Sequence, residues 1–464
     1  MLIRGAEVWG HGITDLRIAG ARIAAIGRLE PSAGERVIAA QGGALLPGLH
    51  DHHIHLAALA ARDASLACGP PEVESADQLA GLLRAQRGTG WLRGVGYHES
   101  VMGLPTAAEL DRLMPDRPLR IQHRSGRMWL LNSAAIDALL AKAAPPPGLR
   151  REGGRYTGHL FDEDAWLRRA LGSTPPDFTA ISARLARWGV TGLTDMSPRN
   201  DAADAAHFCA QHESGALQQQ WWLAGTLALS EAPAVARHLG PAKLHLHEAE
   251  LGDFDAAVAF IAAAHAQDRP VAVHCVSEVE LVFALAAIAA AGARAGDRIE
   301  HVSVASPELV ARMAELGLAV CVQPQFVHER GDRYLLDVEP RHQGDLYRLA
   351  TLAEAGLPLA GGSDAPFASA DPWAAMAAAV SRRTRGGALI GAHEALTPEQ
   401  ALALYCKAPD DLARQRRIAV GEAADLCLLA LPWSEARECL DSTLVRATIV
   451  GGRLAFDGID QAPA

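Results

Sequence analysis

Short runs of alternating apolar and polar residues occupy both ends of the chain. Near the start they are separated by glycine turns and cover residues 2–8, 15–18, 22–26 and 36–39. Near the other end, residues 424–429 and 444–454 have the same character. Such alternation is typical of β-strands that bury one face. The pattern predicts that residues 1–43 and 412–464 pair into one small composite β domain that resembles a β-sandwich.

Between these ends, apolar strand-like runs alternate with alanine- and leucine-rich helical stretches. This order is typical of βα units around a parallel sheet. The candidate strands cover residues 44–49, 190–196, 221–229, 242–247, 270–275, 298–303, 319–324 and 358–363. Eight such units predict an α/β fold, a (β/α)8 TIM barrel over residues 44–411. The stretch after the first strand is far longer than an ordinary connection, so we expect an inserted subdomain at about residues 60–185.

The segment that ends the first candidate strand is rich in ligand-type side chains. After Leu45-Leu46-Pro47-Gly48-Leu49 the chain reads His50-Asp51-His52-His53-Ile54-His55. Side chains two apart in an extended segment point the same way, so Asp51, His53 and His55 share one face, and His50 and His52 lie on the other. A surface cluster is the alternative for any single histidine. Titratable groups this dense beside an apolar strand are costly to bury unless a metal compensates them, which favours a metal site.

Further ligand-type residues lie late in other candidate strands. His274 and His301 end the fifth and sixth strands, and Asp364 follows the eighth. TIM barrels carry their catalytic groups at these C-terminal strand ends. Either histidine alone would more often be a hydrogen-bonded core residue, but a pair in adjacent βα units favours metal ligation. The expected ligands of one ion are His53, His55 and Asp364, and those of a second ion are His274 and His301.

Composition narrows the class of partner. The 464 residues carry a net charge of −11, and the isoelectric point is near 5.9. An acidic surface has no electrostatic attraction to nucleic acid or to an anionic membrane, so a small-molecule substrate is expected instead. The seven cysteines never occur in Cys-x-x-Cys spacing, and no signal peptide or membrane span is visible. These features predict a cytoplasmic protein, and a homodimer is left open.

Lysine is scarce, which makes Lys243 informative. Of the 43 basic residues, only Lys142, Lys243 and Lys407 are lysines. Lys243 precedes alternating leucine and histidine in a strand-like run. A solvated side chain is the ordinary interpretation of an isolated lysine. In a chain that otherwise uses arginine, the pattern favours a special role at this position.

Several motifs in register carry a resemblance to the amidohydrolase superfamily. They are Pro47-Gly48-Leu49-x-Asp51-x-His53-x-His55, Lys243, Val-Ala-Val-His274, Arg-Ile-Glu-His301, Gly362-Ser363-Asp364-Ala365-Pro366 and Gly421-Glu422-Ala423-Ala424-Asp425-Leu426. The long insertion, Gly192-Leu193-Thr194-Asp195 and Leu131-Asn132-Ser133-Ala134 further resemble the branch that includes N-substituted formamide deformylases. The resemblance implies that Lys243 reacts with CO2 and becomes a carbamate that bridges two ions. Arginine could not do this, because its guanidinium stays protonated.

The expected chemistry follows from the donor set. A divalent ion held by neutral imidazoles and a carboxylate lowers the pKa of bound water toward neutrality. We expect a hydrolase acting on carbon–nitrogen bonds other than peptide bonds, of amide or formamide type, in which metal-activated hydroxide attacks the carbonyl. Asp364 is expected to accept the proton and return it to the leaving nitrogen. Two zinc ions are favoured, and iron, manganese and nickel are left open by the same donors.

Two other functions are left open by the residues. A one-metal deaminase of a cyclic amidine would typically have a glutamate three residues after His274, where this chain has Ser277, with Glu278 one position later. A non-catalytic assembly protein on the same fold would lack a ligand, and none is missing.

The insertion supplies candidate substrate contacts at His123, Arg124 and Arg127. The deformylase-like branch often has a histidine where this chain has Arg127, so contacts there are expected to differ. The remaining histidines with no support for a role are His98, His159, His245, His247, His265, His328 and His342, which are expected to be structural or surface residues.

Overall fold

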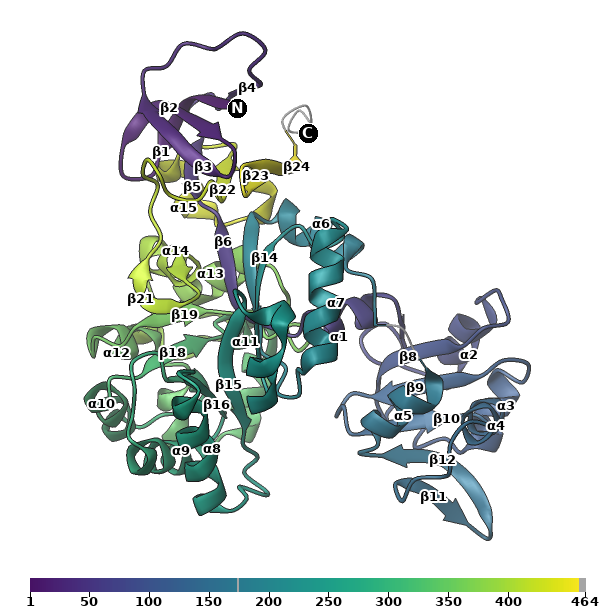
Figure 1. Ribbon diagram of the computed structural model, residues 1–464. Coiled ribbons are helices and arrows are strands. Elements are labelled where there is room, and N and C mark those ends of the chain that lie inside the picture. Colours follow the sequence, from purple (N-terminus) through teal and green to yellow (C-terminus); the bar gives the residue numbers. More distant parts are fainter. Residues whose placement is uncertain (173–174, 459–464) are drawn as a thin grey trace. The chain divides into compact units, whose positions relative to one another are not determined.

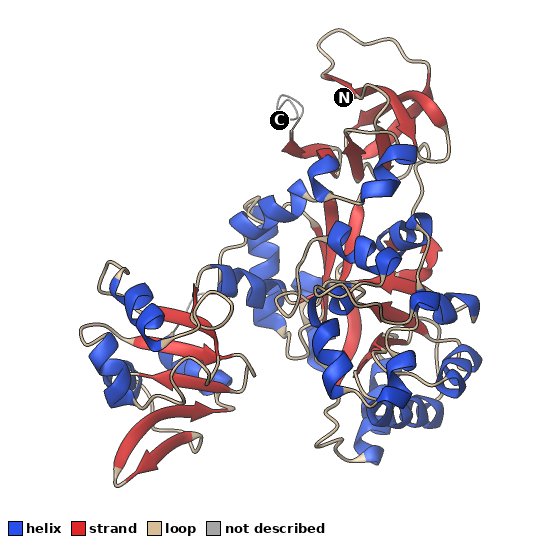
Figure 2. Ribbon diagram, turned by 180° about the vertical axis from the view of Figure 1, so that it is seen from behind, coloured by secondary structure: helices blue, strands red, loops and turns tan. Residues whose placement is uncertain are grey.

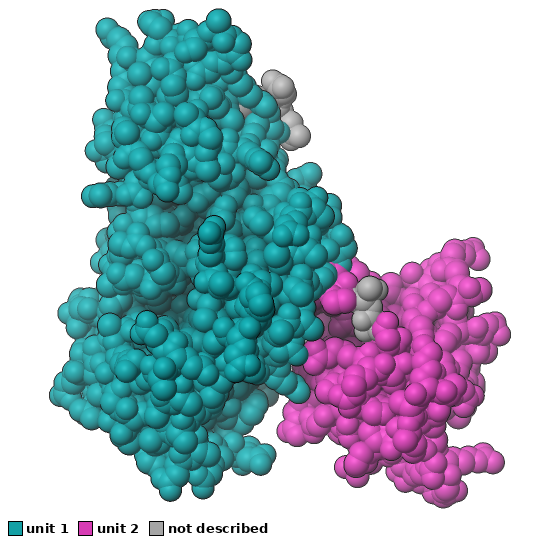
Figure 3. Space-filling view, in the orientation of Figure 1, with its two compact units in different colours: residues 1–56, 177–464 teal, residues 57–176 magenta. Residues whose placement is uncertain are grey.

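The structure is a computed structural model that describes residues 1–172 and 175–458. The chain forms two compact units, one of residues 1–56 with 177–464 and one of residues 57–176, which Figure 3 shows in different colours. The domain bounds expected from the sequence stay a prediction.

Parallel strands that follow one another in sequence order form the central sheet of the first unit (Figure 1). The eight strands are β6 (Leu49–Ile54), β13 (Val190–Asp195), β14 (Gln220–Gly225), β15 (Leu239–His245), β16 (Val271–Cys275), β17 (Arg298–His301), β18 (Ala319–Val322) and β19 (Leu359–Gly361). Two backbone hydrogen bonds join the end of the last strand to the first: the N–H of Asp364 donates to the carbonyl of His53 at 2.6 Å, and that of His55 donates to the carbonyl of Ala365 at 2.8 Å. The predicted TIM barrel is therefore confirmed.

Helices lie around this sheet, as the blue ribbons in Figure 2 show. They include α6 (Thr179–Arg187), α7 (Ala202–Glu213), α8 (Phe254–Ala266), α9 (Glu278–Ala291), α10 (Pro307–Glu315), α11 (Gln325–Asp337), α12 (Leu349–Glu354), α13 (Pro372–Ser381) and α14 (Pro398–Tyr405). Local sequence sets their starts: Ser277 with Glu280 and Thr397 with Gln400 form capping boxes that satisfy the first free N–H groups of α9 and α14. Among the described residues, no helix has the length and apolar character needed to cross a membrane.

The first predicted strand is divided in the structure. Residues of β5 (Ala44–Pro47) pair with the terminal strands, and the barrel strand is β6, which contains the histidines instead of preceding them. Gly48 joins the two, and a Cβ atom there would lie 2.2 Å from Cγ2 of Thr191. The close approach of β6 to β13 therefore requires glycine at this point. Sequence reasoning ended the strand too early because it treated polar side chains as leaving the core, whereas every residue of β6 is buried.

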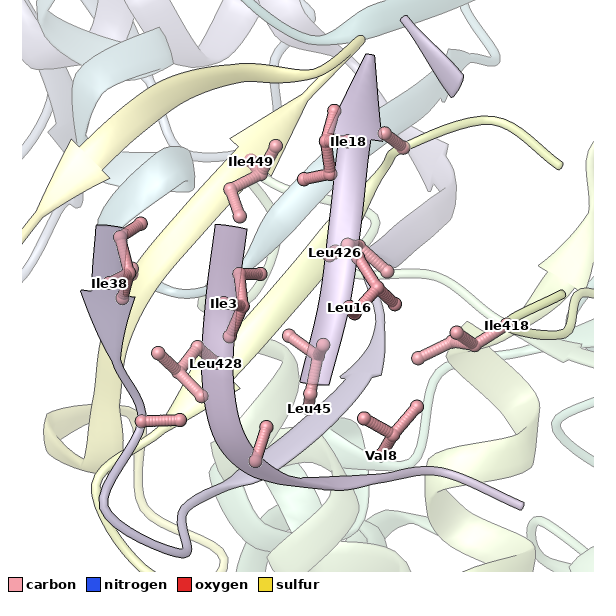
Figure 4. Packing of buried hydrophobic residues seen from close by; sticks show 14 of the residues in the cluster. Ile3, Val8, Leu16, Ile18, Ile38, Leu45, Ile418, Leu426, Leu428 and Ile449 are labelled. Atoms are coloured by element: carbon pink, nitrogen blue, oxygen red, sulfur yellow. The ribbon is translucent and has the colours of Figure 1, made fainter. Parts of the chain in front are cut away.

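Strands from both chain ends, together with β5, form a second eight-stranded sheet in the first unit, while β20 (Lys407–Ala408) and β21 (Asp411–Gln415) pair with each other. Its order is β24-β23-β22-β5-β1-β2-β3, with β4 paired to β1. The bounds are β1 (Leu2–Val8), β2 (Gly12–Ala19), β3 (Arg22–Gly27), β4 (Val37–Ala39), β22 (Leu426–Leu429), β23 (Val445–Val450) and β24 (Arg453–Asp457). Figure 4 shows Ile3 and Leu16 from the N-terminal strands packed with Leu428 and Ile449 from the C-terminal strands. Burial of these side chains holds the two ends of the chain together.

The second unit has its own six-stranded sheet in the order β11-β12-β10-β9-β8-β7. The strands are β7 (Leu66–Ala67), β8 (Leu92–Tyr97), β9 (Leu119–His123), β10 (Met128–Leu131), β11 (Leu149–Glu152) and β12 (Arg155–Phe161), and the helices are α2 (Ala76–Arg84), α3 (Ala107–Leu113), α4 (Ser133–Leu140) and α5 (Asp164–Leu171). Two buried apolar clusters, around Leu110 and around Trp129, supply its core.

Candidate metal centre

His53 of β6 and His55, just after it, meet Asp364, which follows β19, at the C-terminal end of the barrel strands. Nε2 of His55 lies 3.1 Å from Oδ1 of Asp364, and Nε2 of His53 lies 3.4 Å from the same oxygen. One ligand atom each from His53, His301 and Asp364 lie within 4.8 Å of one another. In a tetrahedral zinc site with bonds of 2.0 to 2.1 Å, neighbouring ligand atoms are about 3.3 Å apart. The spacing of these ligand atoms is therefore close to what a divalent ion shared by the three side chains needs.

Hydrogen bonds from the outer nitrogen orient each imidazole of this group. Nδ1 of His53 lies 2.6 Å from Oε2 of Glu300, and Nδ1 of His301 lies 2.7 Å from Oε1 of Gln323. Because both partners are acceptors, each Nδ1 carries a proton, and in the neutral ring Nε2 then has the lone pair that a metal ligand needs. Nε2 of His301 is buried and has no partner among the described residues. Nδ1 of His55 is bonded in the same way, 3.0 Å from Oγ of Ser197.

Glu300, Gln323 and Ser197 are the functional residues that sequence reasoning missed. Glu300 is fully buried and also accepts a hydrogen bond from Nε of Arg298 at 2.6 Å. The one available signal was its position directly before His301 in the run Arg-Ile-Glu-His. An ionisable residue inside a strand of a barrel needs a charged partner, but local sequence does not say which one.

Asp51 shares a face with His53, as expected, but its carboxylate accepts hydrogen bonds from backbone N–H groups. Oδ1 accepts from the N–H of His53 at 3.1 Å and from the N–H of Ser363 at 2.9 Å. Burial raises the pKa of Asp51 to about 6, against the lowering effect of the hydrogen bonds from Ser363. Its carboxylate thus joins β6 to the segment after β19 and holds His53 and Asp364 in register. His50, on the opposite face, bonds Oγ1 of Thr194 through Nε2 at 2.9 Å.

His274 and Lys243 extend the group along the neighbouring strands. The rings of His274 and His301 have centroids 4.4 Å apart. The side chain of Lys243 is buried, and its Nζ has no hydrogen-bond partner among the described residues. Burial lowers the pKa of Lys243, while the charges of Glu300 and Asp364 oppose that shift. Burying an amine without a hydrogen-bond partner is energetically costly. The surrounding side chains therefore do not supply the hydrogen bonds that Nζ of Lys243 needs.

Electrostatics keep the acidic and basic groups in the forms that metal binding needs. Burial raises the pKa of Asp364, but hydrogen bonds from His53 and His55 outweigh it and hold that pKa well below its usual range. Burial lowers the pKa of His301 to about 3 and holds that of His274 well below its usual value. His53 differs, because the nearby charge of Glu300 overcomes burial and raises its pKa. Metal binding would displace that proton.

Backbone strain is concentrated at the same strand ends. His301, Val302 and Asp364 have φ angles of +73°, +50° and +53°. For a β-branched residue such as valine this region is a true outlier, and each such residue costs about 1 to 3 kcal/mol. Strain of this kind persists where the surrounding structure imposes it, as at sites that fix the direction of a ligand side chain.

His245 and His247 lie closer to the group than sequence reasoning allowed. His245 ends β15 in register with His274 of β16, and the two ring centroids are 4.3 Å apart. Burial lowers the pKa of His245 to about 3. The ring of His247 stacks on that of His245 at 4.4 Å. Both residues are exposed, and Lys243 and His245 share one face of β15, while His247 lies beyond its end.

The predicted substrate contacts belong to the second unit. His123 ends β9, and Arg124 and Arg127 follow in the turn before β10. His123 and Arg127 line a cavity of about 480 Å³ that Glu99, Met128 and Phe161 also line. Nε2 of His123 lies 3.2 Å from Oε2 of Glu99, and Arg127 forms an ion pair with Asp162 at 2.8 Å. Another cavity, of about 640 Å³, is lined by His50 and by residues 408–410 and 414–418, and His53, His55, His274 and His301 are not among its lining residues.

Comparisons with known proteins cover nearly the whole chain. The model described as "Amidohydrolase family" matches residues 36–456. The chain is 24% identical over 481 residues to the putative amidohydrolase YtcJ of Bacillus subtilis (strain 168), covering 90% of each protein. It is 24% identical over 488 residues to N-substituted formamide deformylase of Arthrobacter pascens, covering 89% of each. An uncharacterized metal-dependent hydrolase from Pyrococcus horikoshii OT3 superposes with a TM-score of 0.76 at 18% identity, over 96% of this chain and 98% of that one.

Proposed function

The chain belongs to the amidohydrolase family and is a hydrolase of carbon–nitrogen bonds, and from this premise we propose that it cleaves the amide or formamide bond of a small molecule. The observation that carries the proposal is the shared orientation of the imidazoles. His53 and His301 have their Nδ1 atoms bonded to acceptors, so their Nε2 atoms are the ones turned toward Asp364. His53 of β6, His301 of β17 and Asp364 after β19 converge in this way, which supports a metal centre in which His53 and Asp364 belong to one ion and His301 to its neighbour.

The donor set supports a proposal of two divalent ions. In the proposal, His53, His55 and Asp364 hold the first ion, His274 and His301 hold the second, and Lys243 joins them as a carbamate formed with CO2. The buried Nζ of Lys243 supports this role, because a carbamate would replace an unpaired amine with oxygens that the ions can bind. Zinc is the favoured metal, and iron, manganese and nickel accept the same donors. When bound, such ions polarise the substrate carbonyl and lower the pKa of water toward neutrality.

Asp364 is proposed to move the proton. Its carboxylate is ionised, because the hydrogen bonds from His53 and His55 hold its pKa well below the usual range. It can therefore accept a proton from the attacking water. The same carboxyl group then returns the proton to the leaving nitrogen, so that one residue acts first as a general base and then as a general acid.

The deaminase alternative has less support. The position three residues after His274 is Ser277, whose hydroxyl accepts from the N–H of Glu280 and caps α9. Glu280 in turn accepts from the N–H groups of Val276 and Ser277 through Oε2. Ser277 and Glu280 are therefore used in the helix cap, so the position where such a deaminase has its glutamate offers only a capping hydroxyl, and Glu278 lies one residue later, in the first turn of α9.

Metal analysis with a substrate panel tests the proposal. Purified wild-type enzyme should contain two divalent ions per chain and hydrolyse members of a series of N-substituted amides and formamides in preference to cyclic amidines. Lys243→Ala should lose much of the metal, and Lys243→Arg should do no better, because a guanidinium forms no carbamate. Lys142→Ala, at an exposed lysine of the second unit, is the matched control. One ion per chain with turnover of amidines alone would contradict the proposal.

The proposal also covers the substrate contacts and the cellular location of the enzyme. His123, Arg124 and Arg127 are proposed to contact the substrate, and the presence of His123 and Arg127 on the wall of one cavity supports this. A cytoplasmic location is proposed because all seven cysteines are free thiols, which suits a reducing compartment. A homodimer is left open.

A further inference from the structure

Two arginines lie side by side in the sheet of the second unit. Arg93 of β8 is in register with Arg120 of β9, which is the neighbouring parallel strand (Figure 1). Neighbouring strands are about 4.8 Å apart, so the two side chains leave the same face of the sheet as close neighbours. Like charges directly opposite each other on a sheet are destabilising. This pair therefore needs a compensating negative charge.

The surrounding side chains do not supply enough of that charge. Neither guanidinium forms an ion pair or a hydrogen bond with any residue that the structure describes, and Nε of each is buried without a partner. The carboxylate whose charge acts on Arg93 is that of Asp164, and its Oδ1 accepts a hydrogen bond from Nε1 of Trp129 at 2.8 Å. Burial and the charge of Arg93 lower the pKa of Arg120 to about 10, so Arg120 stays charged at neutral pH. Asp164 thus offers one negative charge against two positive ones.

Tryptophan rings hold the two guanidinium groups in place. Cζ of Arg93 lies 5.5 Å from the ring centroid of Trp129. Cζ of Arg120 lies 5.4 Å from the same ring and 5.9 Å from that of Trp91. Both arginine side chains are partly exposed, and only their Nε atoms are buried without a partner, so the terminal nitrogens are open to solvent. The rings therefore orient both groups without using the donors that bind an oxyanion.

We propose that Arg93 and Arg120 together bind a small oxyanion, a carboxylate or a phosphate group. A planar guanidinium presents its N–H donors in pairs, and such a pair matches two oxygens of one carboxylate or phosphate. The bound anion supplies both the charge and the acceptors that the two side chains lack. The arginines belong to the second unit, whereas the proposed metal ligands belong to the first. The inference therefore adds a binding function to the proposed hydrolase.

Isothermal titration calorimetry of the holoenzyme tests the proposal. Sodium phosphate and sodium acetate are each titrated into the protein in HEPES buffer, with the ionic strength held constant by sodium chloride. Wild type should bind, and the anion that binds more tightly identifies the group. Arg93→Met keeps an apolar contact with Trp129, and Arg120→Lys keeps the charge, but each removes one pair of donors. The affinity of either variant should therefore fall about 10-fold or more.

Arg151→Met is the matched control. Arg151 belongs to the same sheet, and its Cζ stacks at 4.0 Å on the ring of Tyr156, whose hydroxyl oxygen accepts from its Nη2. Its register partner on β12 is Tyr156 and not a second arginine. Arg151→Met therefore removes an arginine stacked on an aromatic ring without touching the pair, and it should bind the anion as wild type does.

A metal centre also binds anions, so His55→Ala separates the two sites. This variant lacks a proposed metal ligand and should keep the anion site of the second unit. Loss of anion binding in His55→Ala, with retention in both arginine variants, would place the anion at the metal and overturn the proposal. Absence of binding by wild type would also overturn it.

Thermal unfolding without added anion provides a second measurement. Arg93→Met should melt at the wild-type temperature or above it, because it removes the repulsion from Arg120 and keeps the contact with Trp129. Added phosphate or acetate should raise the melting temperature of wild type and not that of Arg93→Met. A lower melting temperature of Arg93→Met without anion would show that the protein itself compensates the charge, and would count against the proposal.

Discussion

Replacing Glu300 with glutamine removes one charge from a fully buried group of three side chains. Oε2 of Glu300 accepts from Nδ1 of His53 at 2.6 Å, and Oε1 accepts from Nε of Arg298 at 2.6 Å. A glutamine has the same shape but offers one acceptor oxygen and one amide donor. Either Nδ1 of His53 or Nε of Arg298 must therefore face the amide nitrogen of the glutamine, which is itself a donor.

The cost of this change can be worked from the contacts. If the amide oxygen stays with the charged Arg298, the amide nitrogen faces His53 and favours the tautomer with hydrogen on Nε2. That nitrogen is the one aimed at Asp364, and a metal ligand must be unprotonated there. Loss of such an outer partner weakens metal binding by about 10- to 100-fold, or about 1.4 to 2.7 kcal/mol. The free energy of unfolding should fall by less than the roughly 3 to 5 kcal/mol of a fully broken buried pair, since one hydrogen bond is kept.

The assay is Zn²⁺ affinity measured by competition with a chromogenic chelator, with thermal unfolding of the apo protein measured in parallel. Glu394→Gln is the matched control, because Glu394 is equally buried but bonds the N–H of Thr351 and lies beside Arg348. Both variants should lose stability, and only Glu300→Gln should lose Zn²⁺ affinity. Wild-type affinity in Glu300→Gln would refute the inference that Glu300 fixes the tautomer of His53.

Two further predictions concern turnover. Asp364→Asn should fold normally, because asparagine tolerates the φ of +53° at this position. Its kcat should fall about 100-fold or more, because an amide cannot carry the proton. A near-normal kcat would assign the proton transfer to another residue. Arg127→Met breaks the exposed ion pair with Asp162, which contributes little to stability, so KM should rise about 10-fold or more with kcat unchanged. An unchanged KM would remove Arg127 from the substrate contacts.

The sequence by itself determined the barrel and the face of each strand on which donors lie. Eight apolar runs separated by helical stretches were enough to predict the fold, because burial periodicity is a local property. The expectation that His53 and His55 share a face rested on the covalent geometry of an extended chain, which holds whatever the strand pairs with. For the same reason, the sequence alone could have placed Lys243 and His245 on one face of the strand.

Only the tertiary structure decided which donors meet. Glu300 bonds His53 across 247 residues of sequence, and Asp51 bonds the N–H of Ser363 across 312. The structure also set β5 in the terminal sheet and left β6 to the barrel, because the pairing of Leu45 with Val8 and Leu428 depends on both chain ends being present. Contacts of this kind follow from strand register and barrel closure, which are set by packing over the whole chain and leave no mark in any short segment.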